Sequence, residues 1–281
     1  MGRRLFCEYG PICYRISAEK EILRRKVSDL FSRTRFARQR QAVSLPVIVK
    51  GHTTLMLRRL EGVEPTLQQS KVVNLRLASG VLDGLMIAPG EVFSFWHLLG
   101  RCTRRKGYQD GLTISGGSLG QDVGGGLCQL ANLIHYLVLH SPLTVTELHH
   151  HSDALFPDSE RRVPFGTGTS VFYCNVDYRF QNTTDRPVQL RLWIDGDQLC
   201  GELRSAEAFS LRYRLVEEHS RYTREPDGFY RNSEVYRLRF DRASGAELPR
   251  ERILVNHSRV MYDPALIPPE QMEPTPEETT S

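Results

Sequence analysis

Apolar residues recur at helical spacing in three parts of this chain. The segment 18–40 follows Ser17, a residue type that often caps a helix, and carries apolar positions on one side. The segment 67–82 has a second apolar stripe, and Gly84 is suited to end that helix in the left-handed conformation. Residues 127–139 are almost continuously apolar. This pattern predicts a third helix that is buried on most sides.

Alternation of apolar and polar residues predicts strands in much of the remaining chain. The expected strands cover residues 46–50, 53–57, 92–96, 144–149, 169–180, 187–194 and 198–204, with further strands near 229–240 and 252–260. The first two are expected to form a hairpin around Gly51. The fold class predicted is α+β: a buried helix with a cysteine at its N-terminus packs on a mostly antiparallel sheet, and a basic helix precedes both.

Composition divides the chain into three regions. Residues 1–66 hold the basic helix and short strands, and residues 67–263 are expected to form the main domain with a C-terminal extension. Residues 264–281 are rich in proline and glutamate. We expect this tail to be disordered, because it offers little apolar surface to bury.

Charge and length exclude several classes of protein. The chain has 281 residues, 40% hydrophobic residues and a net charge of +4, which is typical of a globular protein. Basic residues gather between Arg24 and Arg40, where they form either a solvated face or a surface for phosphates or anionic lipids. The aromatic platform of a single-strand binder is missing there, so no nucleic acid partner is expected.

The N-terminus and the cysteines suggest a compartment. No export signal and no transmembrane segment can be recognised, which makes the cytoplasm the expected location. The six cysteines lie far apart and are expected to be mostly reduced. No dinucleotide fingerprint or P-loop is present, so no cofactor is expected. The oligomeric state does not follow from the sequence.

Cys128 follows Gly124, Gly125 and Gly126 and precedes Gln129, where a loop gives way to a helix. A helix N-terminus favours an anion and can lower the pKa of a thiol, and glycines allow a close approach of substrate. Most free cysteines are buried residues without a reactive role. The glycine-cysteine run taken alone favours that structural interpretation.

A nucleophilic Cys128 would need a base and a group that orients it. We favour His151 as the base, with Ser152 beside it, Asp177 as a candidate orienting residue and Gln129 with nearby N–H groups as an oxyanion site. Satisfied or surface histidines are equally compatible with the pattern, and for Asp177 an ordinary strand-edge carboxylate is the favoured interpretation. The set His149, His151 and Cys128 could also bind zinc, although the paired spacing of structural zinc motifs is missing and no metal is expected.

Several motifs together resemble the VanW family, the proteins encoded with vancomycin B-type resistance clusters. They are Ala88 to Phe95, Gly124 to Gln129, His151-Ser152 and Asp177 to Thr184, with weaker likeness at Tyr230 to Asn232, Asn256-His257 and Met261-Tyr262. The strong resemblance covers about residues 71–204. It is carried mainly by the glycine-cysteine-glutamine motif and its flanks.

The resemblance implies two alternative functions. Some exported relatives are described as cysteine-dependent L,D-transpeptidases of peptidoglycan, which implies Cys128 as nucleophile and His151 as its partner. Those relatives often have Asp-Ala-Thr-Val where this chain has Gly168 to Val171, so an acidic group is missing here. The first hypothesis is thiol acyl transfer or amide hydrolysis on cell-envelope peptides. The second is a non-catalytic accessory or binding protein associated with glycopeptide resistance.

Overall fold

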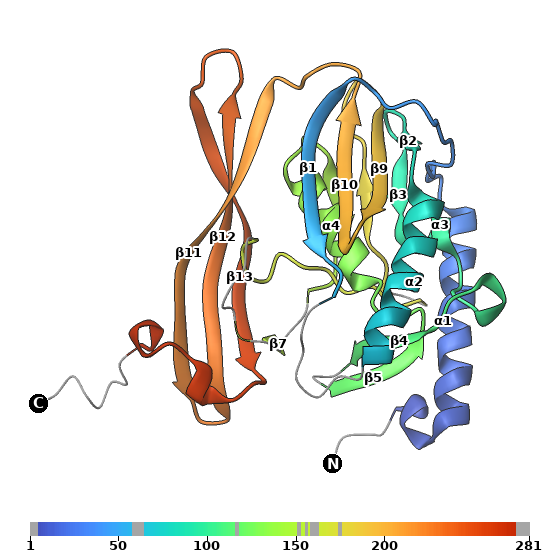
Figure 1. Cartoon of the computed structure of the whole chain (residues 1–281), viewed down its shortest axis with the longest axis vertical. Coiled ribbons are helices and arrows are strands. Elements are labelled where there is room, and N and C mark those ends of the chain that lie inside the picture. Colours follow the sequence, from blue (N-terminus) through green and yellow to red (C-terminus); the bar gives the residue numbers. More distant parts are fainter. Residues whose placement is uncertain are drawn as a thin grey trace, which may run out of the picture.

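The computed structural model describes residues 5–57, 65–115, 118–150, 153–154, 157, 163–173 and 176–273. Figure 1 shows a body of helices and strands beside a separate ribbon of long strands that the C-terminal part of the chain forms. The sheets are mostly antiparallel and the helices pack on those of the body. The predicted α+β class is therefore confirmed.

Four strands form the central antiparallel sheet of the body, in the order β1, β10, β9, β2. Their bounds are Val47–Leu55 (β1), Leu85–Ile87 (β2), Val188–Asp195 (β9) and Gln198–Ser205 (β10). Helix α4 (Cys128–Leu139) packs on β1 and β10, and helix α2 (Pro65–Leu82) packs on β9. Gly201 in β10 allows α4 to come close, because a Cβ there would meet Leu133 at 3.0 Å.

Two smaller sheets complete the body. The order β3, β8, β6 gives one of them, and the hairpin of β4 and β5 gives the other. Their bounds are Val92–Ser94 (β3), Asp110–Ser115 (β4), Ser118–Val123 (β5), Thr144–Glu147 (β6) and Arg179–Gln181 (β8). A short helix α3 (Phe95–Leu99) follows β3, and Ser94 caps it by accepting a hydrogen bond from His97 N. The hairpin leads directly into the glycine run before α4.

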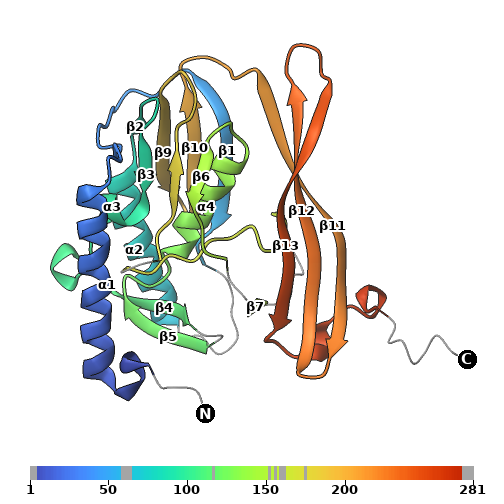
Figure 2. The same ribbon diagram turned by 180° about the vertical axis from the view of Figure 1, so that it is seen from behind.

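The C-terminal ribbon contains three long antiparallel strands and one short parallel strand, in the order β11, β12, β13, β7. Their bounds are Asp153–Ala154 (β7), Leu211–Glu225 (β11), Gly228–Asp241 (β12) and Glu247–Val260 (β13). Figure 2 shows the ribbon from behind, next to the face of the body that carries α4. The Asn256 side chain ties the two parts by donating to the carbonyl of Phe165 at 2.9 Å.

The predicted tail begins with ordered structure. Two 3-10 turns, η3 (Pro264–Leu266) and η4 (Pro269–Gln271), follow β13, and Ile267 between them is buried. The backbone of Glu273 donates to the carbonyl of Tyr222 in β11 at 2.8 Å. Residues 264–273 therefore pack against the ribbon, and the rest of the tail lies outside the described residues.

Helix α1 (Pro11–Phe31) lies on the outside of the body, after a 3-10 turn η1 (Phe6–Tyr9) (Figure 1). The sequence predicted this helix at 18–40, and both ends are wrong. Proline at the first helical position needs no hydrogen-bond partner for its nitrogen, which explains the earlier start. Beyond the helix, the backbone of Ala37 donates to the carbonyl of Val92, so this segment is extended along β3. In the described part of the chain, no helix is long and apolar enough to cross a membrane.

Two strand predictions are also wrong. Residues 46–50 and 53–57 do not form a hairpin, because β1 runs through Gly51 and pairs along its length with β10. The strand expected at 169–180 is reduced to β8 at its end. The backbone N–H of Thr169 instead donates to the side chain of Asn132 in α4, which takes it out of any ladder.

Candidate functional site

Cys128 is the first residue of α4, as the sequence predicted, and its side chain is half-buried. Its Sγ donates a hydrogen bond to the carbonyl of Val171, 3.7 Å away. A carbonyl only accepts, so this contact uses the thiol proton. Burial raises the pKa of the Cys128 thiol above its ordinary value. The geometry therefore holds a neutral thiol at the start of the helix.

The three glycines before Cys128 are required by backbone conformation at Gly124 and Gly126 and by close backbone packing at Gly125. Gly124 and Gly126 have φ of 85° and 90°, a left-handed conformation that glycine adopts without strain. A Cβ on Gly125 would lie 2.2 Å from the backbone of Gly111 in β4. The N–H groups of Gly124 and Gly125 donate to the carbonyls of Gln109 and Asp122. Two of the N–H groups in the run are thus already used inside the protein.

Gln129 links α4 to the central sheet. Its Nε2 donates to Thr54 Oγ1 at 2.9 Å and to the carbonyl of Leu55 at 2.8 Å, both in β1. Its Oε1 is buried and has no hydrogen-bond partner among the described residues. The side chain predicted to bind substrate is therefore held at the end of β1 by its amide nitrogen.

Asp177 is the buried member of a partly buried group of charges beside β8, here called the Asp177 cluster. The group is formed by Arg25, Asp29, Glu147, Asp177 and Arg179. One carboxylate oxygen of Asp177 accepts from Ser94 Oγ at 2.5 Å and from Arg179 Nε at 2.7 Å. The other accepts from the backbone of Trp96 at 3.0 Å. These contacts fix the start of α3 and the end of β8.

The opposing charges in the Asp177 cluster offset the cost of its burial. Burial alone would raise the pKa of Glu147, but hydrogen bonds from Arg25 and His149 outweigh it, and the net pKa is lowered. Burial would likewise lower the pKa of Arg179, yet Asp29 and Asp177 raise it overall. Both shifts favour the charged forms of Glu147 and Arg179.

The histidine run after β6 is only partly described. His149 Nε2 lies 3.1 Å from Glu147 Oε1, and His150 Nδ1 lies 3.2 Å from the carbonyl of Gly166. His151 and Ser152, the predicted base and its neighbour, lie outside the described residues. The pairings of His151 with Cys128 and with Asp177 therefore stay predictions. The described residues hold no group of three or more His, Cys, Asp or Glu side chains suited to a metal ion.

The sequence interpretation missed a buried histidine in α4. His135 is 1% exposed, and its Nδ1 lies 3.0 Å from the hydroxyl of Tyr178. Its Nε2 is buried without a hydrogen-bond partner in the described part of the chain. Burial, together with nearby His150, lowers the pKa of His135 to about 3. A polar residue inside an almost continuous apolar run was the available signal.

Asn74 in α2 joins the glycine run to a neighbouring pocket. This side chain is fully buried, and its Nδ2 donates to the carbonyls of Gln109 at 2.9 Å and Gly125 at 3.0 Å. Its Oδ1 accepts from the backbone of Gln109 at 2.8 Å. Asn74 thereby fixes the position of Gln109, which lines the pocket.

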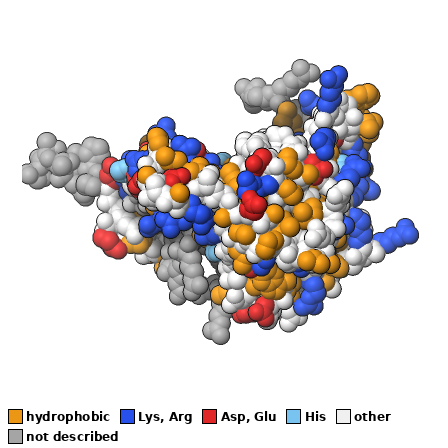
Figure 3. All heavy atoms as spheres, turned by 90° about the horizontal axis from the view of Figure 1, so that it is seen from above, with side chains coloured by type: hydrophobic (Ala, Val, Ile, Leu, Met, Phe, Trp, Pro, Cys, Tyr) orange, Lys and Arg blue, Asp and Glu red, His pale blue; other side chains and the backbone are white. Residues whose placement is uncertain are grey.

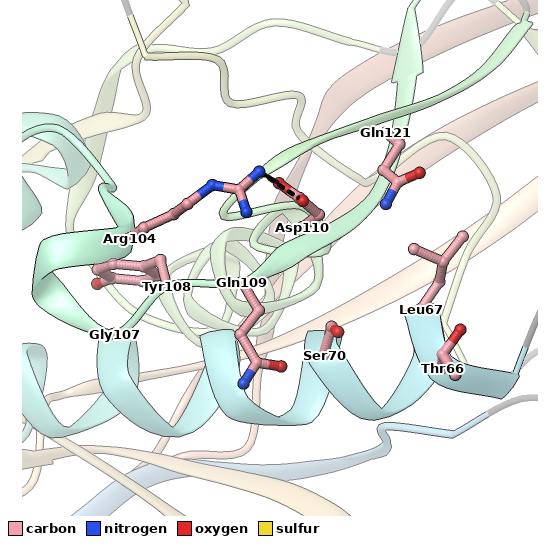
Figure 4. A pocket seen from close by; sticks show the side chains of 9 residues that line it. All are labelled: Thr66, Leu67, Ser70, Arg104, Gly107, Tyr108, Gln109, Asp110 and Gln121. Atoms are coloured by element: carbon pink, nitrogen blue, oxygen red, sulfur yellow. Dashed lines mark hydrogen bonds and ion pairs between the residues drawn. The ribbon is translucent and has the colours of Figure 1, made fainter.

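The pocket lies between the first turns of α2 and the segment that leads into β4 (Figure 4). It has a volume of about 530 Å³ and a mostly polar lining of Thr66, Leu67, Ser70, Arg104, Gly107, Tyr108, Gln109, Asp110 and Gln121. Arg104 donates two hydrogen bonds to Asp110, at 2.7 and 3.0 Å, across one side of it. No motif in the sequence pointed to these residues, because they come from three separate segments.

Known proteins share sequence similarity with the part of the chain that contains the glycine run. Residues 70–204 match the family described as "VanW like protein". The chain is 29% identical to the "Vancomycin B-type resistance protein VanW" of Enterococcus faecalis over 78% of its own length and 80% of that protein. It is also 29% identical to the "Uncharacterized protein YoaR" of Bacillus subtilis over 53% of its own length and 47% of that protein.

No solved structure matches this chain significantly. The matched segment runs from α2 through the glycine run and α4 into β10. It contains seven of the nine pocket residues and, of the Asp177 cluster, Glu147, Asp177 and Arg179. Residues 70–204 of this chain therefore belong to the VanW family.

Proposed function

We propose that this chain is a non-catalytic accessory protein that binds a short polar peptide of the cell-envelope type in the pocket between α2 and β4. The observation that carries the proposal is the pocket itself. Its volume of about 530 Å³ lies in the range of ordinary small-molecule sites. The lining offers two amides, hydroxyls and both signs of charge.

The charges on the pocket wall suit a zwitterionic ligand. Arg104 and Asp110 pair with each other near the surface, and a peptide could exchange that pair for its own carboxylate and ammonium groups. Gln109 and Gln121 line the same space, and their amide groups can pair with peptide bonds. An ion pair at an exposed position is weak, so its replacement costs little.

The state of the Cys128 thiol supports the acyltransferase hypothesis less well than the pocket supports a binding protein. Thiol acyl transfer needs a thiolate, whereas burial raises the pKa of Cys128 and its proton is engaged by Val171. The amide nitrogen of Gln129, which the sequence assigned to the oxyanion site, is engaged by Thr54 and Leu55 as well. An accessory role also agrees with the similarity to a protein named for vancomycin B-type resistance. These observations support our proposal of a binding role in glycopeptide resistance.

Calorimetric titration of the full chain with synthetic peptidoglycan-type peptides tests the proposal. We expect saturable binding, and Arg104→Ala should weaken it about 10-fold or more, since a charge-assisted hydrogen bond contributes that much. Arg105→Ala is the matched control, because Arg105 is an exposed neighbour in the same turn that does not line the pocket. It should bind like the unchanged protein.

Intact-mass analysis of the same mixtures separates binding from catalysis. Cys128→Ser should bind the peptides as well as the unchanged protein does, and neither should carry an acyl adduct or convert the peptide. An adduct on Cys128, or binding that is insensitive to Arg104→Ala, would contradict the proposal.

A further inference from the structure

Helix α1 turns an apolar stripe to the outside of the molecule. Ile12, Ile16, Leu23, Val27 and Leu30 follow one another at spacings of four, seven, four and three positions, which places them on one helical face. All five are exposed, from 44% at Val27 to 78% at Leu30. A surface helix normally buries such a stripe.

The opposite face of α1 is fixed to the body mainly by charge. Ile22 is the buried residue of the helix. Arg25 pairs with Glu147, and Asp29 accepts two hydrogen bonds from Arg179 at 2.7 and 2.8 Å. These contacts belong to the Asp177 cluster, so the inward face cannot rotate outward without breaking a buried network. These contacts of the inward face therefore fix the apolar stripe on the outside of the molecule.

Basic residues flank the stripe, and the acidic residues of the helix are paired. Arg15, Lys20 and Lys26 are exposed and form no ion pair within the described part of the chain. The three acidic ones pair with arginines: Glu19 with Arg101, Glu21 with Arg24, and Asp29 with Arg179. The outward face of α1 thus combines apolar side chains with unneutralised positive charge.

The apolar surface continues beyond both ends of the stripe. Phe31 at the C-terminal end is 81% exposed, and Phe6 and Tyr9 of η1 are exposed before the N-terminal end. Figure 3 shows hydrophobic and basic side chains next to each other along the rim of the body. A patch of this length and composition is rare on a surface without a binding role.

We propose that α1 docks flat on an anionic phospholipid bilayer. The stripe enters the boundary between headgroups and acyl chains, while Arg15, Lys20 and Lys26 reach the lipid phosphates. The charged residues along both sides of the helix suit a position in the plane of the interface. This inference does not depend on the peptide pocket.

Charge favours a membrane over a second copy of the chain. A dimer formed through this face would bring Arg15, Lys20 and Lys26 of two copies together around the apolar contact, and like charges oppose that approach. An anionic bilayer supplies the opposite charge and an apolar layer at once. The same face thus satisfies both kinds of side chain.

Sedimentation of the full chain with lipid vesicles tests this proposal. We expect binding to vesicles that contain about one third phosphatidylglycerol, weaker binding to phosphatidylcholine alone, and loss of binding at high salt. The double variant Leu23→Glu/Leu30→Glu should bind at least about 10-fold more weakly, and Lys20→Glu/Lys26→Glu should show a similar loss on anionic vesicles only. Both pairs are exposed, so the fold should be retained.

The control variant Val255→Glu/Leu266→Glu removes two exposed apolar residues from the C-terminal ribbon and η3. It should bind anionic vesicles like the unchanged protein. The proposal is overturned if the unchanged chain does not bind anionic vesicles at low salt, or if the control loses as much binding as the Leu23/Leu30 variant. A dimer that Leu23→Glu/Leu30→Glu dissociates, without any vesicle binding, would assign the face to a second copy instead.

Discussion

Arg179 and Asp29 form a two-pronged ion pair between β8 and α1, although 150 positions separate them in the chain. Arg179 also donates to Asp177 at 2.7 Å, so one guanidinium serves two carboxylates. Both acids lie largely away from solvent, with side chains 16% and 4% exposed. This arginine therefore connects the outer helix to the buried start of α3.

Replacement of Arg179 should destabilise the fold strongly. Arg179→Met keeps the length of the side chain but leaves Asp29 and Asp177 without this cation, and loss of one partner of a buried pair costs about 3–5 kcal/mol. Urea unfolding followed by circular dichroism measures the change. Arg186→Met is the control, because Arg186 pairs with highly exposed acids. Equal decreases of the free energy of unfolding in the two variants would show that the Asp177 cluster stabilises the fold no more than a surface ion pair does.

A single methyl group on Gly125 should disturb the approach of the glycine run to β4. In Gly125→Ala the new Cβ would lie 2.2 Å from the carbonyl group of Gly111, where only backbone could move away. Overpacking of this kind costs about 1–3 kcal/mol. The thermal midpoint is the measurement.

Gly80→Ala in α2 is the matched substitution. A Cβ at Gly80 meets nothing within 4 Å, so alanine should leave stability unchanged or raise it. If both variants behave alike, the close approach of Gly125 and Gly111 is not needed for stability.

The spacing of apolar residues predicted a helix correctly where its apolar stripe packs into the core. Helices α2 and α4 were predicted within about two residues, and Cys128 at the start of α4 followed from the glycines before an apolar run. The ends of α1 were misjudged because the outer stripe of that helix is exposed to solvent, so its spacing does not mark a packed helix, and because Ser17 resembles an N-cap. The long strand β11 was not predicted at all.

The candidate site was less predictable than the fold. The partners of Asp177 and the two pocket walls meet only in three dimensions, through contacts such as Arg179 with Asp29 and Asn74 with Gly125. No spacing within the sequence encodes these contacts. The buried Asn74 and His135 could be noticed as polar positions on apolar helix faces, but their partners could not.

The thiol of Cys128 should react slowly near neutral pH. Burial raises its pKa, so the thiolate fraction in the folded protein is smaller than that of a free cysteine. Alkylation by iodoacetamide, followed by peptide mass mapping, should give a Cys128 rate well below that of the same residue in urea. Faster alkylation of Cys128 in the folded protein would instead indicate an activated nucleophile and would revive the acyltransferase hypothesis.

Acid should destabilise this protein partly through two buried histidines. Burial lowers the pKa of His135 to about 3 and that of His140 to about 4, whereas an unfolded histidine titrates near 6.5. Both rings are neutral in the folded state. Above about pH 6.5 they are neutral in the unfolded state as well, so in that range they do not lower the free energy of unfolding. Between pH 6.5 and 4 the unfolded state binds more protons, and each histidine removes about 1.4 kcal/mol of stability per pH unit. Urea unfolding at several pH values should therefore give a flatter pH dependence of the free energy of unfolding for His135→Gln than for the unchanged protein. Parallel curves for the unchanged protein and His135→Gln would contradict this assignment.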